Sequence, residues 1–207
     1  MLHIDIETRS DVDLKKLGVH RYTESPGFSV LLIAFAYDDG PVEIVDLAQG
    51  EELPESLLHD LIDPRVPKAA FNAQFERVCL DRHLGLKTGP WHCSMVQANA
   101  LGLRGSLDTI GFALNLSPDE QKLKTGKNLI RLFSLHRLPS SKNGYRTIYE
   151  PEDRPFEWAM FKDYCCRDVE AERAIFHKLS DFPLPPKEQE LYVLDQKIND
   201  RGVCIDL

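Results

Sequence analysis

Two acidic residues, Asp5 and Glu7, stand two positions apart in an N-terminal segment that alternates apolar and polar residues. This alternation predicts a β-strand, in which residues i and i+2 leave the same face. Two carboxylates on one face repel each other, and a bound cation relieves that repulsion. An exposed edge strand with its polar residues in water explains the pair as well, so the pair alone does not define a site.

A further acid, Glu76, follows Asn72 at a predicted junction between a strand and a helix. Asn72 is a suitable N-cap, but the acid of a capping box would occupy the position of Phe75. Glu76 therefore comes one residue too late to cap the helix and is available for other chemistry. The simpler alternative is a solvated first-turn acid that interacts favourably with the helix dipole.

Tyr164 and Asp168 form a third group, four residues apart inside a long helical pattern. Residues i and i+4 share a helix face, so the phenol and the carboxylate can meet over one target. Taken alone, this pair is equally compatible with an exposed surface.

The elements that must position these groups alternate between strands and helices. Strand patterns occur at 2–7, 29–37, 42–47, 66–71 and 91–94, with a turn at 38–41 that makes 29–47 a hairpin. Helical patterns cover 54–62, 73–84, 94–101, 106–114, 118–133 and 156–179, with Ser106 and Gly85 as caps. Residues 139–155 are predicted to form a loop.

A proline-rich segment, Phe182–Pro186, predicts a boundary after residue 181. Residues 187–200 then read as an amphipathic helix with Leu191, Leu194 and Ile198 facing inward. A new strand pattern begins at 203–207, where the chain stops. We therefore expect a catalytic domain over 1–181, and a linker, a helix and the start of a following region over 182–207 of a longer protein.

The composition restricts the classes of protein that the chain can belong to. The chain has 207 residues, and 33 Asp and Glu against 25 Lys and Arg give a net charge of −8. Such an acidic chain cannot bind nucleic acid through bulk charge and needs a local patch. No secretory signal precedes the first strand, and no uncharged stretch reaches the roughly 20 residues of a membrane helix. No membrane association is expected.

The five cysteines include no CxxC motif, which favours a reduced, cytoplasmic chain. Cys79, His83, His92 and Cys93 are close in sequence and suggest a zinc site as an alternative. Adjacent His92 and Cys93 fit tetrahedral coordination poorly, so buried cysteines are the favoured interpretation.

A basic cluster occupies the helical pattern before residue 133. It consists of Lys122, Lys124, Lys127 and Arg131, followed in the next loop by Lys142 and Arg146. These side chains could follow the phosphates of single-stranded DNA. A solvated helical face explains them equally well.

Taken together, the three groups form an ordered pattern: Asp-x-Glu at 5–7, Asn-x-x-x-Glu at 72–76 and Tyr-x-x-x-Asp at 164–168. This pattern resembles the three motifs of the DEDD 3′–5′ exonucleases, in the version with tyrosine in the third motif (DEDDy). The resemblance covers nearly all of residues 1–180 and is closest to the proofreading domain of phage and bacterial family A DNA polymerases. The segments 127–133 and 194–203 also resemble phage-type members.

The resemblance implies an α/β, ribonuclease H-like fold, a mixed five-stranded sheet with helices on both faces. It also implies two divalent metal ions, Mg²⁺ or Mn²⁺, which Asp5 would bridge. Glu7 and Asp168 would complete the tighter metal site, and Glu76 would hold the second ion, where the commoner pattern has aspartate. Asn72 and the basic cluster would contact the 3′ end of single-stranded DNA. A polymerase region in cis and a bacterial or phage-infected cytoplasm are the implied setting.

Two alternatives remain open from the sequence. A ribonuclease D-like RNA exonuclease shares the same motifs. A catalytically inactive domain that only binds nucleic acid or supports structure would be compatible with Glu76 in place of aspartate.

Overall fold

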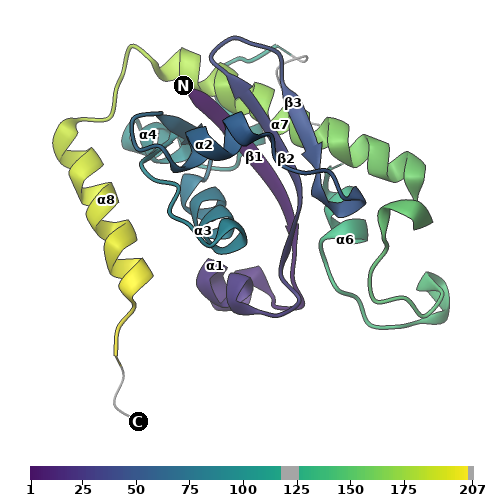
Figure 1. Ribbon diagram of the computed structural model, residues 1–207. Helices are drawn as coiled ribbons and strands as arrows, with labels where there is room; N and C mark the ends of the chain where they lie inside the picture. Colours follow the sequence, from purple (N-terminus) through teal and green to yellow (C-terminus); the bar gives the residue numbers. More distant parts are fainter. Residues whose placement is uncertain (118–125, 205–207) are drawn as a thin grey trace.

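A computed structural model describes residues 1–117 and 126–204. Its centre is one mixed sheet of five strands in the order β3-β2-β1-β4-β5 (Figure 1). The strands are β1 (Leu2–Arg9), β2 (Ser29–Tyr37), β3 (Glu43–Asp46), β4 (Lys68–Ala70) and β5 (Trp91–Cys93). Only β2 runs against its neighbours, because β1–β4 and β4–β5 pair in parallel. The predicted fold class and hairpin are confirmed.

Helices cover both faces of this sheet (Figure 1). They are α1 (Leu14–Glu24), α2 (Glu55–Ile62), α3 (Ala73–Leu84), α4 (Ser94–Ala100), α5 (Leu107–Ala113), α6 (Gly126–Phe133), α7 (Pro155–Leu179) and α8 (Pro186–Arg201). Ser106 caps α5 through the Thr109 amide, as predicted. The first half of the predicted helix 118–133 lies outside the described residues. None of the described helices has the length and apolar character needed to cross a membrane.

The alternation in β1 separates an apolar face from an acidic one. Ile4 and Ile6 are buried in a core with α2 and α3, which also contains Cys79 and Cys93. The opposite face of the sheet packs against α6 and α7 through a second core that includes Leu32 and Ala34 of β2. These two residues pair with Glu7 and Asp5 in the β1–β2 ladder, so both acids lie on the α7 side.

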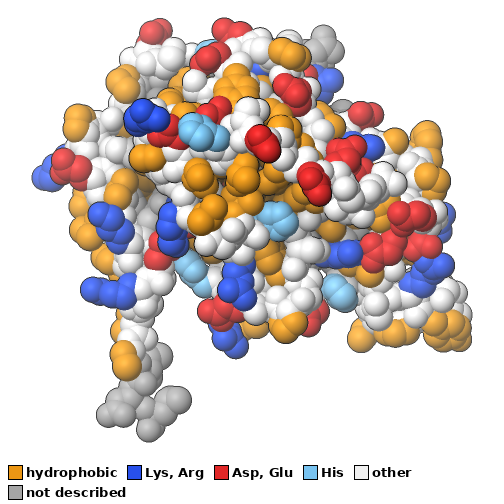
Figure 2. Space-filling model, in the orientation of Figure 1, with side chains coloured by type: hydrophobic (Ala, Val, Ile, Leu, Met, Phe, Trp, Pro, Cys, Tyr) orange, Lys and Arg blue, Asp and Glu red, His pale blue; other side chains and the backbone are white. Residues whose placement is uncertain are grey.

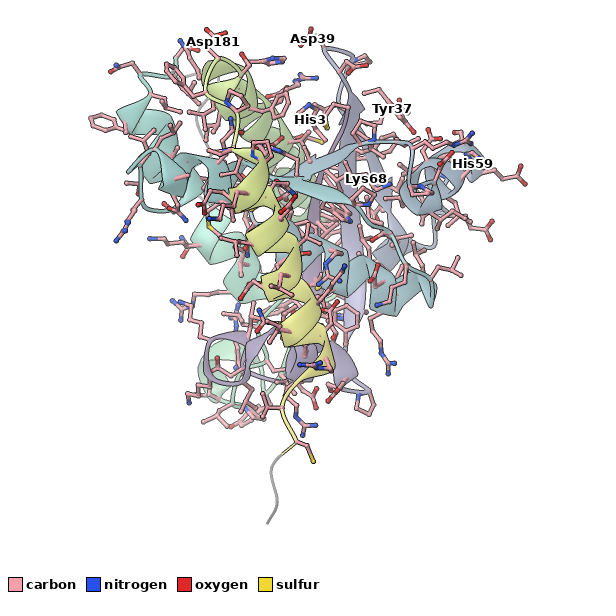
Figure 3. All side chains as sticks on the ribbon, turned by 90° about the vertical axis from the view of Figure 1, so that its left-hand side faces the viewer. His3, Tyr37, Asp39, His59, Lys68 and Asp181 are labelled. Carbon is pink, nitrogen blue, oxygen red and sulfur yellow. The ribbon has the colours of Figure 1, made fainter. Side chains whose placement is uncertain are left out.

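Helix α8 lies along the edge of the molecule (Figures 1 and 3). The prediction that Leu191, Leu194 and Ile198 face inward is wrong, since all three are exposed. Gln196 is buried instead, and Asp200 accepts two hydrogen bonds from Arg77, at 2.9 and 2.7 Å. The ion pair and Gln196, four residues apart, orient the helix so that its apolar stripe faces away from the body. The predicted strand at 203–207 lies mostly outside the described residues.

Candidate active site

The first pair of acids lies on an inner strand of the sheet. β1 is flanked by β2 and β4, so the edge-strand alternative for Asp5 and Glu7 is wrong. Glu7 is buried and Asp5 is half-buried. The β1–β2 register shifts between Glu7 and Thr8. Irregularities of this kind often re-aim side chains beside active sites.

Helix α7 brings the third motif onto the same face of β1. The thiol of Cys165 donates to Asp5, with Sγ 3.6 Å from Oδ2, so this part of α7 packs directly on the strand. Asp168 is 4% exposed and Tyr164 is 2% exposed. Helix α7 therefore places a buried phenol and a buried carboxylate beside β1. The alternative of an exposed surface pair is wrong.

Glu76 reaches the site from the first turn of α3. Strand β4 ends at Ala70 and runs parallel to β1, so the turn that follows it lies at the same edge of the sheet. Glu76 is 5% exposed, and its Oε2 has no hydrogen-bond partner among the described residues. The solvated first-turn acid is therefore excluded. Asn72 occupies the N-cap position, as predicted, but its side chain makes no capping hydrogen bond.

Several negative charges surround Glu76. Burial raises the pKa of its carboxyl well above the ordinary value, and the charges of Asp5, Glu172 and Asp168 raise it further. The three motifs are thus brought together at one buried, acidic place.

The Tyr164 ring is closely packed. It stacks on Phe161 with ring planes 10° apart and centroids 6.2 Å apart. Gly126, the first residue of α6, lies against the Cδ2, Cε2 and Cζ atoms of the ring. A Cβ atom at this position would overlap them. Burial raises the pKa of the phenol far above its usual range, as do the charges of Asp168, Glu7 and Asp5. Tyr164 therefore stays protonated and can donate a hydrogen bond into the site.

The site contains one acid that the sequence analysis did not identify. Glu172 follows Asp168 by one helical turn, is 2% exposed and pairs with His3 of β1. The signal was present in the spacing, because Tyr164, Asp168 and Glu172 repeat every four residues.

The donor set suits a hard divalent cation, because it consists of buried carboxylate oxygens, which Mg²⁺ and Mn²⁺ prefer. The carboxylate oxygen of Glu76 that lacks a described hydrogen-bond partner is consistent with such a ligand. Within 1–117 and 126–204, no three His, Cys, Asp or Glu side chains are already arranged to hold one ion. Side-chain rotation would have to bring the carboxylates into contact with a metal.

The predicted nucleic-acid contacts lie on the surface where they are described. Lys127 and Arg131 are exposed on one side of α6, and Asn72 is exposed at the start of α3. Lys122 and Lys124 lie outside the described residues. Figure 2 shows Lys and Arg spread among acidic side chains on the visible face, with no single basic stripe.

The sheet order and the buried acids define the chain as a ribonuclease H-like α/β domain. A solved nuclease in its apo form has the same fold, with a TM-score of 0.51 and 15% sequence identity over 95% of this chain and 81% of that one. The structure of Brucella melitensis NrnC aligns with a TM-score of 0.47 and 14% identity, over 95% of this chain and 81% of its own. No family model matches the sequence.

In sequence, the chain is similar to a DNA polymerase of Bacillus phage SP02. The two are 51% identical over 208 residues, which cover 100% of this chain and 32% of the polymerase. The chain therefore spans about a third of the length of that relative. This similarity confirms the resemblance to phage DNA polymerases that the three motifs predicted.

Proposed function

We propose that residues 1–181 form a metal-dependent 3′–5′ exonuclease domain that removes nucleotides from the 3′ end of single-stranded DNA. The observation that carries the proposal is the meeting of three separate segments, β1, α3 and α7, at one buried acidic place. The similarity to a phage DNA polymerase supports DNA as the substrate. Because that relative is about three times longer, we also propose that residues 182–207 lead toward a polymerase region in the same parent chain.

The four carboxylates have distinct roles in this proposal. Asp5 would contribute to the binding of both divalent ions, Glu7 and Asp168 to the tighter site, and Glu76 to the second. When bound, two such ions would supply Lewis-acid chemistry: polarisation of the phosphodiester, a more acidic attacking water and stabilisation of the leaving 3′ oxygen. When bound, the four positive charges of two such ions would offset the four carboxylates, which would allow an acidic domain to approach a polyanion.

Tyr164 would orient the attacking water. A buried phenol that stays protonated is a poor base but a good hydrogen-bond donor. Phe161 and Gly126 both pack against its ring, which restricts the position of the hydroxyl. Positioning of this kind lowers the barrier by fixing the geometry of attack.

A digestion experiment tests the proposed reaction. Single-stranded DNA and RNA of the same sequence, labelled at the 5′ or the 3′ end, are incubated with the full chain and Mg²⁺, Mn²⁺ or excess EDTA. We expect 5′-monophosphates released from the 3′ end of DNA with either metal, and none with EDTA. Faster degradation of RNA would indicate the ribonuclease D-like alternative, and DNA binding without cleavage would indicate an inactive domain.

Variants of Glu76 test its role at the second ion. If the carboxylate acts through a water molecule, Glu76→Asp should retain or raise the cleavage rate. Glu76→Ala should lose about tenfold to a hundredfold, the usual cost of losing an outer-shell metal contact. Single-turnover rates at saturating Mn²⁺ measure both. An unchanged rate in Glu76→Ala would remove this residue from the metal site.

A further inference from the structure

Two rows of polar side chains face each other between β1 and α7. The strand presents every second residue on this face, and the helix presents every fourth along one stripe. Two contacts fix the alignment of the helix on the strand. His3 contacts Glu172, and Asp5 contacts Cys165, which comes seven residues earlier on α7. The two elements therefore run in opposite directions.

The contact between His3 and Glu172 is fully enclosed. His3 Nδ1 lies 2.6 Å from Glu172 Oε2, with the two side chains 1% and 2% exposed. The hydroxyl of Ser94, at the start of α4, donates to the other carboxylate oxygen, Oε1. Both oxygens of Glu172 are therefore occupied, in contrast to Oε2 of Glu76. We therefore assign Glu172 a structural role, as the hydrogen-bonding partner of His3 and Ser94, and not the role of a metal ligand.

Further contacts hold this end of α7 in place. Phe176 packs edge-on against His3 and His92, with centroid distances of 5.1 and 5.3 Å. Gln97 Oε1 accepts from His92 Nε2 over 2.8 Å, and the Gln97 amide nitrogen donates to the carbonyls of Leu179 and Phe182. Figure 3 shows His3 toward the same end of the molecule as Asp181, just beyond α7. The His3 ring is thus held with Nδ1 directed at Glu172.

The N-terminal half of α7 has a separate anchor. Trp158 Nε1 donates to Asp46 Oδ2 over 2.7 Å, and both residues are buried. Asp168 lies between this anchor and Glu172. A slip of one helical turn, about 5.4 Å, would bring Glu172 to the level that Asp168 occupies. Because both residues are acids, carboxylate chemistry alone cannot exclude the wrong alignment, whereas the His3 contact can.

We infer that His3, Glu172 and Ser94 are positioning residues that fix α7 along β1, so that Asp168 faces Asp5 and Glu76 for metal binding. The inference rests on the proposed function. Partners that orient metal ligands typically affect metal affinity by about tenfold to a hundredfold when they are removed.

The test measures Mn²⁺ affinity of the full chain by calorimetry without DNA, together with thermal unfolding of the metal-free protein. His3→Leu should weaken Mn²⁺ binding by about tenfold to a hundredfold, whereas His3→Asn, whose amide can donate as Nδ1 does, should recover most of the loss. Ser94→Ala changes little volume and should weaken binding by about tenfold. If His3→Leu does not fold, the Mn²⁺ affinity of Ser94→Ala tests the inference.

Ile175→Ala serves as the matched control, because Ile175 is buried on the same helix in a hydrophobic cluster that includes none of the three residues. It should lower the unfolding temperature without changing Mn²⁺ affinity. Wild-type affinity in His3→Leu or Ser94→Ala, or an equal loss in Ile175→Ala, would overturn the inference. Failure of the proposed function looks different, because the wild-type chain itself would then bind no Mn²⁺ and cleave no DNA.

Discussion

Asp5→Ala should reduce DNA cleavage to background, a loss of about a thousandfold or more. Asp5 is the carboxylate proposed to contact both ions, and metal stabilisation of the transition state is worth several kcal/mol, of which each 1.4 kcal/mol or so is a factor of ten. The metal-free fold should not suffer. Asp5 adds negative charge beside Glu76, so its removal relieves repulsion and should leave the unfolding temperature unchanged or raised.

Two measurements separate these effects. Single-turnover cleavage with Mn²⁺ gives the loss of rate, and thermal unfolding with and without Mn²⁺ gives the loss of binding, because a bound metal raises the unfolding temperature. The matched control is Asp181→Ala, an exposed aspartate beyond α7 that should behave as wild type. Substantial activity in Asp5→Ala would reject the two-metal mechanism.

The strands of the sheet could be predicted from the sequence because each has a distinct pattern of apolar and polar residues. β2 is a continuous apolar run buried on both faces, and β1 alternates between Ile and acidic residues, so each has a clear period. The short turn at 38–41 predicted that the strand after it pairs antiparallel with β2. Helix α1 was missed because Gly18, at φ +77°, interrupts its helical geometry and its pattern.

The site was predictable in its members but not in its environment. Spacing alone indicated Asp5, Glu7, Glu76, Tyr164 and Asp168, yet each group taken alone was compatible with an exposed position. Burial decides between the two interpretations, and burial depends on which helix covers which strand. That is a tertiary property, since α7 lies more than 140 residues from β1 in the sequence.

Glu172 and the outer stripe of α8 show two ways in which pattern reasoning fails. Glu172 lies on the motif stripe, but only its contacts with His3 and Ser94 reveal that its oxygens are already occupied. For α8, the apolar residues predicted an inward face, whereas the Arg77–Asp200 ion pair selects a different one. In both cases polar contacts with distant segments decide the arrangement.

Tyr164→Phe should slow cleavage by about tenfold to a thousandfold, at or below the usual range for a positioned acid–base group. The loss is smaller than for a metal ligand because the phenol only orients the water. Asp168→Ala, one turn later on α7, should fall to background. Single-turnover rates from pH 6 to 9 should show no step near pH 6.5, the ordinary pKa of histidine, because no imidazole has this role. A Tyr164→Phe enzyme as fast as wild type would remove tyrosine from the mechanism.

Gly126 provides an independent test, because its backbone fits against the Tyr164 ring with no room for a methyl group. Gly126→Ala should push the ring aside, slow cleavage by about tenfold or more and cost about 1–3 kcal/mol of stability through overpacking. In the Tyr164→Phe background, the same ring is displaced but the hydroxyl is already absent. The double variant should therefore be little slower than Tyr164→Phe alone, while the stability cost persists. An equal loss of rate in both backgrounds would mean that Gly126 acts through the fold and not through the tyrosine hydroxyl.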